Sequence, residues 1–213
     1  MDQLPAAPED EIDFLRNGGS EALAALFSRY QKRLERMVAL RLDRRLYARV
    51  DAADVLQEAY LEISRRIDDY LAKEPATFFV WIRQITWQIL LMTHRRHLGA
   101  QRRSAGQEVS LRWTGPDGGT SVSLAGFLVA HLTSPSQAVI REERYAQLRD
   151  ALDQMDPLDR EVLALRHFEH LGNSEVAEVL DIQPTAASNR YVRALKRLKQ
   201  MLESMPEIRG EDR

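Results

Sequence analysis

Three arginines near the end of the chain have a spacing that suits contact with a polyanion. Arg190, Arg193 and Arg197 lie at i, i+3 and i+7, so they share one face if their segment is helical. Guanidinium groups bind phosphates and base edges through well-directed hydrogen bonds. The spacing therefore predicts a helix face that contacts the phosphates and base edges of DNA.

The segment that carries these arginines is predicted to be amphipathic. Lys196 and Lys199 add positive charge beside the arginines, although the whole chain has a net charge of only -2. A solvated helix with cations near its C-terminus is the alternative interpretation of the same pattern. Residues at helical spacing are expected to pack inward, and they are Ala187, Tyr191, Ala194, Leu195, Leu198 and Leu202.

The elements that would position the arginines resemble a helix-turn-helix. A short helix is expected over 173–180, after Gly172, and a three-residue break over 181–183 leads into a longer helix from Pro184 to about Leu202. Upstream, Asp156 is expected to cap a further helix, and the serine and proline at 134–135 are expected to open the whole helical region. In a helix-turn-helix the second helix enters the major groove.

A second candidate surface lies in the first half of the chain. Asp51 is expected to cap a helix, with Asp54 three residues on, and an apolar stripe follows. The opposite face is acidic and amide-bearing, which suits a basic helical partner. Its residues are Asp54, Gln57, Glu58 and Glu62.

Two further helices complete the predicted first half. One runs from Glu21 with apolar residues at three- and four-residue steps. The other follows Pro75, runs to about His97, carries apolar and aromatic residues on more than one face, and ends in a basic cluster that includes Arg95 and Arg96. Aromatic rings beside arginines can stack on exposed bases and neutralise phosphates. For Phe79 and Trp81, however, core packing is the favoured interpretation.

Composition argues against several other classes of protein. The chain has no cysteine, which excludes disulfides and thiolate zinc sites and fits a reducing cytoplasm. Neither histidine pair, 94 with 97 or 167 with 170, has the His-Glu-x-x-His arrangement of a zinc hydrolase, and no phosphate-binding glycine loop is present. The acidic start lacks the features of a signal peptide, and no apolar run is long enough to span a membrane. We expect no enzyme activity, no metal and no cofactor.

Four segments of the second half resemble the fourth conserved region of sigma-70 family proteins. They are ALDQMDPLDREV (151–162), LRHF (165–168), EVAEVL (175–180) and RALKRL (193–198). In that family this domain reads the minus-thirty-five promoter element. The resemblance therefore implies that the DNA-binding residues of the recognition helix are Thr185, Ser188, Asn189, Arg190, Arg193 and Arg197.

The first half resembles the second region of the same family. DVLQEAYL (54–61) is similar to the helix that docks on the polymerase's largest subunit, which implies core polymerase binding by Asp54, Gln57, Glu58 and Glu62. WIRQI (81–85) and the arginines that end its helix are similar to the segment that melts and reads the minus-ten element. The implied DNA-binding residues of this melting region are Arg83, Trp87, Gln88, Arg95 and Arg96.

The lack of the family's middle domain points to the extracytoplasmic-function (ECF) type. The expected fold is all-α, with an N-terminal tail (1–20), a region 2 bundle (21–103), a flexible linker (104–133), a region 4 helix-turn-helix (134–205) and a C-terminal tail (206–213). The expected partners are bacterial core RNA polymerase, promoter DNA, and an anti-sigma factor or other regulator. The alternative is an operator-binding regulator, which would explain the second domain only.

Overall fold

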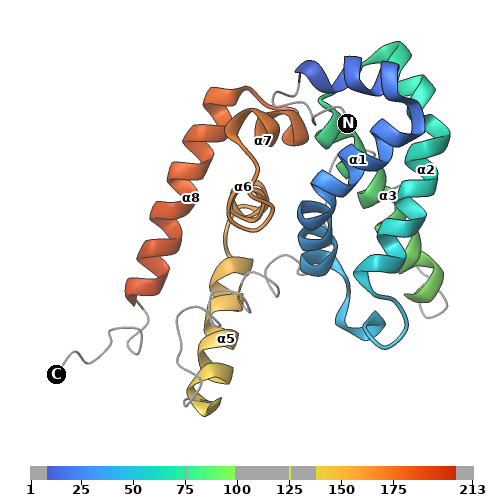
Figure 1. Cartoon of the computed structure of the whole chain (residues 1–213). Helices are drawn as coiled ribbons and strands as arrows, with labels where there is room; N and C mark the ends of the chain where they lie inside the picture. Colours follow the sequence, from blue (N-terminus) through green and yellow to red (C-terminus); the bar gives the residue numbers. More distant parts are fainter. Residues whose placement is uncertain (1–8, 75, 99–124, 126–137, 205–213) are drawn as a thin grey trace. The chain divides into compact units, whose positions relative to one another are not determined.

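The computed structural model describes residues 9–74, 76–98, 125 and 138–204, and all regular elements in these residues are helical, as predicted (Figure 1). The chain divides into two compact units, residues 1–108 and 109–213. The predicted linker, except for Ala125, and the predicted C-terminal tail lie outside the described residues. Of the predicted N-terminal tail only residues 1–8 lie outside them, because residues 9–20 are helical. None of the described helices is long and apolar enough to cross a membrane.

The first unit is a bundle of three helices that pack on one another. They are α1 (Glu9–Arg41), α2 (Ala52–Lys73) and α3 (Phe78–Leu98), and a 3-10 turn, η1 (Arg44–Leu46), lies between α1 and α2. Figure 1 shows that α1 ends, α2 begins and α3 ends at the same end of this bundle. Residues from distant parts of the sequence can therefore form one surface there.

Helix α1 begins well before Glu21, where the apolar spacing predicted a start. Gly19 has φ 53° and ψ -133°, a backbone conformation that kinks the helix and favours glycine. The stretch before the kink is held by tertiary contacts: Leu15 is buried, and the Tyr30 hydroxyl donates a hydrogen bond to the buried carboxylate of Glu11. Burial and the hydrogen bond to Glu11 raise the pKa of Tyr30 well above its ordinary value.

Helix α2 has the predicted start. The backbone N–H of Asp54 donates to the Asp51 carboxylate at 2.9 Å, and the N–H of Asp51 donates to the Asp54 carboxylate at 3.0 Å. This reciprocal capping box satisfies two backbone donors and fixes where the helix begins. The buried stripe of the helix consists of Val55, Leu56, Ala59, Ile63 and Tyr70.

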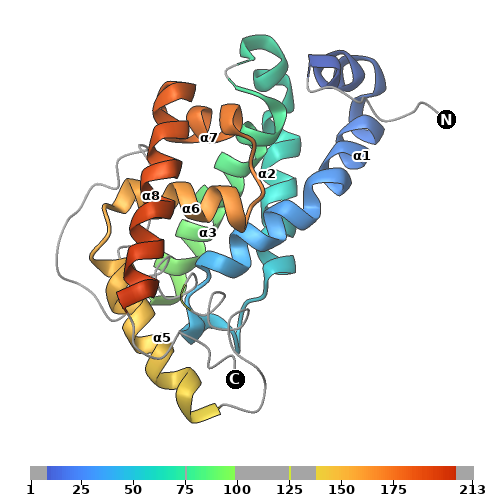
Figure 2. The ribbon, with the colours of Figure 1, turned by 90° about the vertical axis from the view of Figure 1, so that its left-hand side faces the viewer.

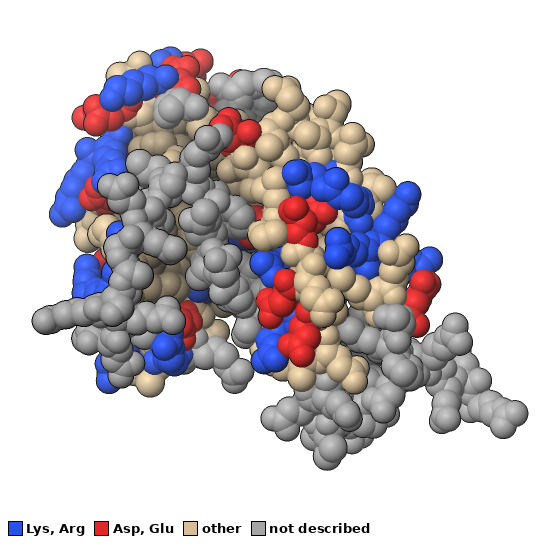
Figure 3. All heavy atoms as spheres, turned by 180° about the vertical axis from the view of Figure 1, so that it is seen from behind, with Lys and Arg blue, Asp and Glu red and all other residues tan. Residues whose placement is uncertain are grey.

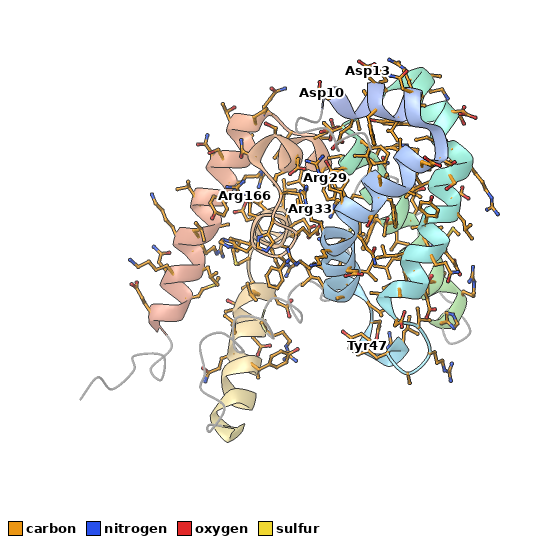
Figure 4. All side chains as sticks on the ribbon, in the orientation of Figure 1. Asp10, Asp13, Arg29, Arg33, Tyr47 and Arg166 are labelled. Carbon is orange, nitrogen blue, oxygen red and sulfur yellow. The ribbon has the colours of Figure 1, made fainter. Side chains whose placement is uncertain are left out.

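Helix α3 supplies most of the aromatic core, as its apolar surface predicted. Trp81 stacks on Tyr70 with ring centroids 4.4 Å apart, and Phe79 lies 5.0 Å from Tyr30. The guanidinium of Arg33 lies 3.6 Å from the Phe79 ring centroid, and Figure 4 marks Arg33 on α1. Phe79 and Trp81 are therefore core residues.

The second unit contains α5 (Ala138–Asp153), α6 (Pro157–His167), α7 (Asn173–Leu180) and α8 (Pro184–Ser204). Asp156 caps α6 as predicted, since its carboxylate accepts from the backbone N–H groups of Leu158 and Asp159. Asp181 closes α7 in the left-handed conformation, and α8 follows after three residues. Figures 1 and 2 both show α8 lying against α6 and α7, which is the predicted helix-turn-helix arrangement.

Removal of the α2 cap tests this account of the first unit. We expect Asp51→Ala to lower the free energy of unfolding by about 1 kcal/mol, because the Asp54 N–H loses its acceptor. Asp51→Asn keeps an acceptor oxygen and should stay within about 0.5 kcal/mol of the parent. Urea unfolding followed by circular dichroism measures both, and equal losses in the two variants would contradict the capping role.

Candidate interaction surfaces

The acidic face of α2 is exposed, as its sequence pattern predicted. Asp54, Gln57 and Glu58 are exposed, Glu62 is half-buried, and Leu61 lies among them with 51% of its surface exposed. A single exposed leucine is ordinary by itself, but beside carboxylate and amide groups it offers a partner both apolar and polar contacts. This face therefore has the chemistry of a docking site for a helix with basic and apolar residues.

The carboxylates of this face already have partners within the first unit. Glu62 forms ion pairs with Arg65 and Arg66, which lie about one turn further along α2. Glu58 accepts a hydrogen bond from Arg96 of α3 at 3.1 Å. Exposed pairs of this kind contribute only about 0–1 kcal/mol each, so a binding partner can displace them at little cost.

The pair between Glu58 and Arg96 joins residues that the sequence analysis assigned to different partners. A groove runs along this junction, and its lining residues are Arg49, Val50, Asp54, Val55, Gln57, Glu58, Leu61, Thr93, Arg96 and His97. The predicted polymerase-binding face of α2 and the predicted DNA-binding end of α3 are therefore adjacent. No local pattern in the sequence indicates this adjacency.

The predicted melting-region residues of α3 divide into a buried and an accessible group. Arg83 and Trp87 are buried, whereas Gln88 is half-buried and both Arg95 and Arg96 are exposed. Trp87 is covered in part by α1, because the Arg41 guanidinium lies 5.8 Å from its ring centroid. Of the predicted melting-region residues, Gln88, Arg95 and Arg96 are therefore the ones that a nucleic acid can reach without rearrangement of the helix bundle.

His94 ties the basic end of α3 to the connection between α1 and α2. Its Nε2 atom lies 3.3 Å from the backbone nitrogen of Asp43, which donates to it. Burial lowers the pKa of His94, in opposition to the nearby Asp43 carboxylate, so the neutral ring that accepts this bond is favoured. The histidine therefore acts as a structural acceptor.

The arginine face of α8 points toward α6, which the sequence analysis did not predict. Arg190 donates to Asp159 at 2.9 Å, and Arg193 donates to both of its carboxylate oxygens at 2.8 and 2.6 Å. The Asp159 side chain is only 3% exposed. Arg197 donates to the carbonyl oxygen of Gln154 at 3.3 Å. All three arginines therefore help to hold α8 against α6 and the turn that precedes it.

These contacts also explain the electrostatics of Asp159. Hydrogen bonds from Arg193, and then from Arg190, lower the pKa of Asp159 below its ordinary value against the opposing effect of burial. The carboxylate stands in the first turn of α6, where the helix dipole favours an anion. No local pattern in the sequence identifies Asp159 as the partner of the arginines, because a carboxylate in a first helical turn is equally consistent with an interaction with its own helix end.

The outward face of α8 carries a different set of side chains. At 100° per residue, the positions opposite the buried Ala187 and Ala194 form one continuous exposed stripe. The stripe consists of Thr185, Ser188, Asn189, Val192, Lys196 and Lys199. Figure 3 shows Lys and Arg side chains gathered over the second unit together with acidic ones. Hydroxyl and amide groups followed by lysines suit base edges and phosphates.

A second cluster, which the sequence analysis missed, fixes α8 against α6. The Tyr191 hydroxyl lies 3.2 Å from His167 Nε2, and the Arg166 guanidinium lies 5.1 Å from the Tyr191 ring centroid. Burial, and then the charge of Arg166, lower the pKa of His167. Together with Asp159, this cluster orients the outward stripe of α8.

Within the described residues no group of three or more His, Asp or Glu side chains could hold a metal ion.

Comparison with known proteins identifies relatives of both units. Residues 145–198 match the family model described as Sigma-70, region 4. Over 199 residues the chain is 23% identical to the RNA polymerase sigma-H factor of Pseudomonas aeruginosa, covering 91% of this chain and 93% of that protein. It is 28% identical over 194 residues to the RNA polymerase sigma factor CarQ of Myxococcus xanthus, covering 90% and 95%.

Two further comparisons agree with these. The ECF RNA polymerase sigma-E factor of Haemophilus influenzae is 21% identical over 194 residues, with 91% of this chain and 94% of that protein covered. The solved structure of CnrH in complex with the cytosolic domain of CnrY has a similar fold, with a TM-score of 0.51 and 18% identity. That likeness covers 92% of this chain and 96% of CnrH.

The carboxylate beneath the α8 arginines gives a pH-dependent prediction. We expect Asp159→Asn to lower the free energy of unfolding of the second unit by about 2 kcal/mol at pH 7, because two charge-assisted hydrogen-bonding partners lose their anion. The native pKa of Asp159 is lowered, so this stabilisation is fully present above the ordinary aspartate value of ~3.9 and is lost as pH falls through the native pKa. Urea unfolding between pH 3 and 7 should show the difference between parent and variant shrinking at the acid end.

Asp150→Asn provides a matched control for this measurement. It removes the same charge from an exposed pair with the neighbouring Arg149, and we expect a change below about 0.5 kcal/mol at every pH. A difference between parent and Asp159→Asn that stayed constant down to pH 3 and below would contradict the electrostatic account.

Proposed function

Because this chain is a sigma factor of the sigma-70 family, extracytoplasmic-function type, we propose that it binds core RNA polymerase, directs it to specific promoters and promotes opening of the DNA. The supporting observation is the surface of the first unit on which an acidic face with an exposed leucine adjoins a basic helix end. A protein-docking face next to a polyanion-binding face is what a subunit that links polymerase to DNA requires.

Core polymerase would dock on the exposed face of α2. Gln57 and Glu58 offer an amide and a carboxylate, Asp54 and Glu62 extend the polar face along the helix, and Leu61 supplies an apolar contact. A basic helix with an apolar residue complements this combination. The negative charge would speed association and fix orientation, while burial of Leu61 would contribute to the lifetime of the complex.

The two units would read two different parts of a promoter. In the first, Gln88, Arg95 and Arg96 of α3 would contact the minus-ten element as it opens, with Arg83 and Trp87 supporting them from the core. In the second, the outward stripe of α8 would enter the major groove at the minus-thirty-five element.

Within α8 the proposed contacts divide by chemistry. Thr185, Ser188 and Asn189 would face base edges, since hydroxyl and amide groups hydrogen-bond to bases in the major groove. Lys196 and Lys199 would contact phosphates. Arg193 has 59% of its side chain exposed and could also reach a phosphate from its place on Asp159. Arg190 and Arg197 would act chiefly by orienting the helix.

Regulation by a protein partner is part of the proposal. CnrH, whose fold this chain shares, is seen bound to the cytosolic domain of CnrY. We infer that a protein of comparable role, an anti-sigma factor, restrains this chain in the cytoplasm until polymerase can bind it. No catalytic step is proposed for the chain itself.

Co-elution with core polymerase tests the docking face. We expect the intact chain to co-elute stoichiometrically with bacterial core RNA polymerase on size exclusion. The double variant Gln57→Lys, Glu58→Lys should lose at least tenfold in affinity for the polymerase, because its lysines would face a basic partner. Absence of binding by the intact, folded chain would instead favour the operator-binding regulator.

A matched control lies on α1. Gln31 and Glu35 form an exposed amide and carboxylate pair at 2.8 Å, and the double variant Gln31→Lys, Glu35→Lys makes the same change of charge on a different helix. It should co-elute like the parent. Equal loss in both double variants would show a non-specific effect of charge and contradict the assignment of the α2 face.

The sequence preference and the salt dependence of DNA binding should distinguish base contacts from phosphate contacts by α8. With holoenzyme and duplex fragments selected from a random pool, Asn189→Ala should cost about 1–3 kcal/mol on the preferred sequence and little on others, because one base contact is lost. Lys196→Ala should weaken binding uniformly and reduce the slope of log affinity against log salt by about one. Uniform loss in Asn189→Ala would contradict a base contact.

A further inference from the structure

We propose that Tyr47 and Arg49, in the connection between α1 and α2, form a binding site for single-stranded nucleic acid, with the Tyr47 ring stacking on an unpaired base and Arg49 neutralising a neighbouring phosphate. The site deepens the proposed function, and the identity of the strand as opened promoter DNA rests on that function. Arg49 also lines the groove between α2 and α3 described above, whereas Tyr47 belongs to none of the surfaces assigned so far.

The first observation is the exposure of Tyr47. Its side chain is 55% exposed, the highest value among the large apolar residues of the described chain that lie in solvent. No aromatic partner covers it within the described residues, whereas Tyr30, Tyr60 and Tyr70 all pack against other rings. An uncovered aromatic ring is the feature on which bases stack in proteins that bind single strands.

The second observation is that the connection holds Tyr47 in a fixed position. Leu46 and Val50 on either side of it are buried, and the backbone N–H groups of Arg49 and Val50 both donate to the carbonyl oxygen of Leu46, at 2.8 and 3.0 Å. The N–H of Asp43 is tied to His94 of α3. A ring presented by an anchored turn loses little conformational freedom when it binds.

The third observation is the charge of the connection. Residues 41–51 contain four arginines and two aspartates. Asp43 is neutralised by Arg45, which donates to both of its carboxylate oxygens, and Asp51 is engaged in the α2 capping box. Arg49 is exposed and makes no ion pair within the described residues. Arg49 is therefore a cation without a carboxylate partner in the described residues, and it lies two positions along the chain from Tyr47.

The fourth observation is continuity with the proposed DNA-binding end of α3. Arg49 and Val50 line the same groove as Arg96 and His97. Figure 1 shows the connection and the end of α3 at one end of the bundle, and Figure 4 marks Tyr47 on the connection there. The exposed Arg95, which also lacks an ion pair within the described residues, extends the positive charge. A strand held by α3 could therefore continue over Tyr47.

Fluorescence anisotropy with the full chain tests the site. The probes are a labelled single strand of about 20 mixed nucleotides and the duplex of the same sequence, at low salt. We expect Tyr47→Ala to weaken binding of the strand about fivefold or more while leaving the duplex within twofold, because only an unpaired base can stack on the ring. Tyr47→Phe keeps the ring and should bind the strand within about twofold of the parent.

Arg49→Gln tests the phosphate contact. It should reduce the salt slope for the strand by about 0.7, whereas Lys73→Gln, which removes an exposed cation at the other end of α2, should not change it. Circular dichroism melting of every variant checks that the fold is retained.

Several results would overturn the site. These are equal affinity of parent and Tyr47→Ala for the strand, equal losses on strand and duplex, or no binding of the strand by the intact chain. Loss of co-elution with core polymerase in Tyr47→Ala, without loss of strand binding, would make the ring a protein contact. Failure of the intact chain to bind polymerase, with strand binding still dependent on Tyr47, would overturn the proposed function and leave the site standing.

Discussion

One buried carboxylate determines which face of α8 is available for binding. Asp159 stands in the first turn of α6 and accepts hydrogen bonds from Arg190 and Arg193 of α8. Burying a carboxylate is costly unless charged donors compensate it, so Arg190 and Arg193 lie on the side of α8 that faces Asp159, although 59% of the Arg193 side chain remains exposed. This placement leaves the stripe from Thr185 to Lys199 in solvent. The surface of the second unit therefore follows from a contact in its interior.

In the first unit the corresponding constraint is aromatic packing. Tyr30 of α1, Tyr70 of α2 and the rings at the start of α3 pack into one cluster that fixes the three helices against each other. Because this cluster buries one side of α2, the acidic side must face solvent. The same packing buries Arg83 and Trp87 and leaves the C-terminal turns of α3 as its accessible part. Helices α2 and α3 each have thus one face in the core and one part in solvent.

Local signals in the sequence were sufficient for the helices, because capping and periodicity depend on neighbouring residues. Asp51 with Asp54, and Asp156 with Pro157, predicted two helix starts that the structure confirms. Capping and periodicity cannot predict contacts between helices, because those contacts join residues that are far apart in the sequence. Periodicity placed the arginines of α8 on one face correctly, yet it carried no information about Asp159, which is 31 residues from Arg190 in the chain. The helical stretch before Gly19 was missed for the same reason, since the interaction of Glu11 with Tyr30 stabilises it.

The ion pair between Glu58 and Arg96 would make the two proposed binding faces of the first unit energetically dependent on each other. Any ligand that takes the Glu58 carboxylate leaves the Arg96 guanidinium without its anion, and any polyanion that takes Arg96 frees Glu58. Linkage requires this effect to be reciprocal, so each ligand raises affinity for the other by the same factor. An exposed pair worth at most about 1 kcal/mol limits that factor to about fivefold. The two proposed faces would thus bind their ligands with a modest positive cooperativity that salt would weaken.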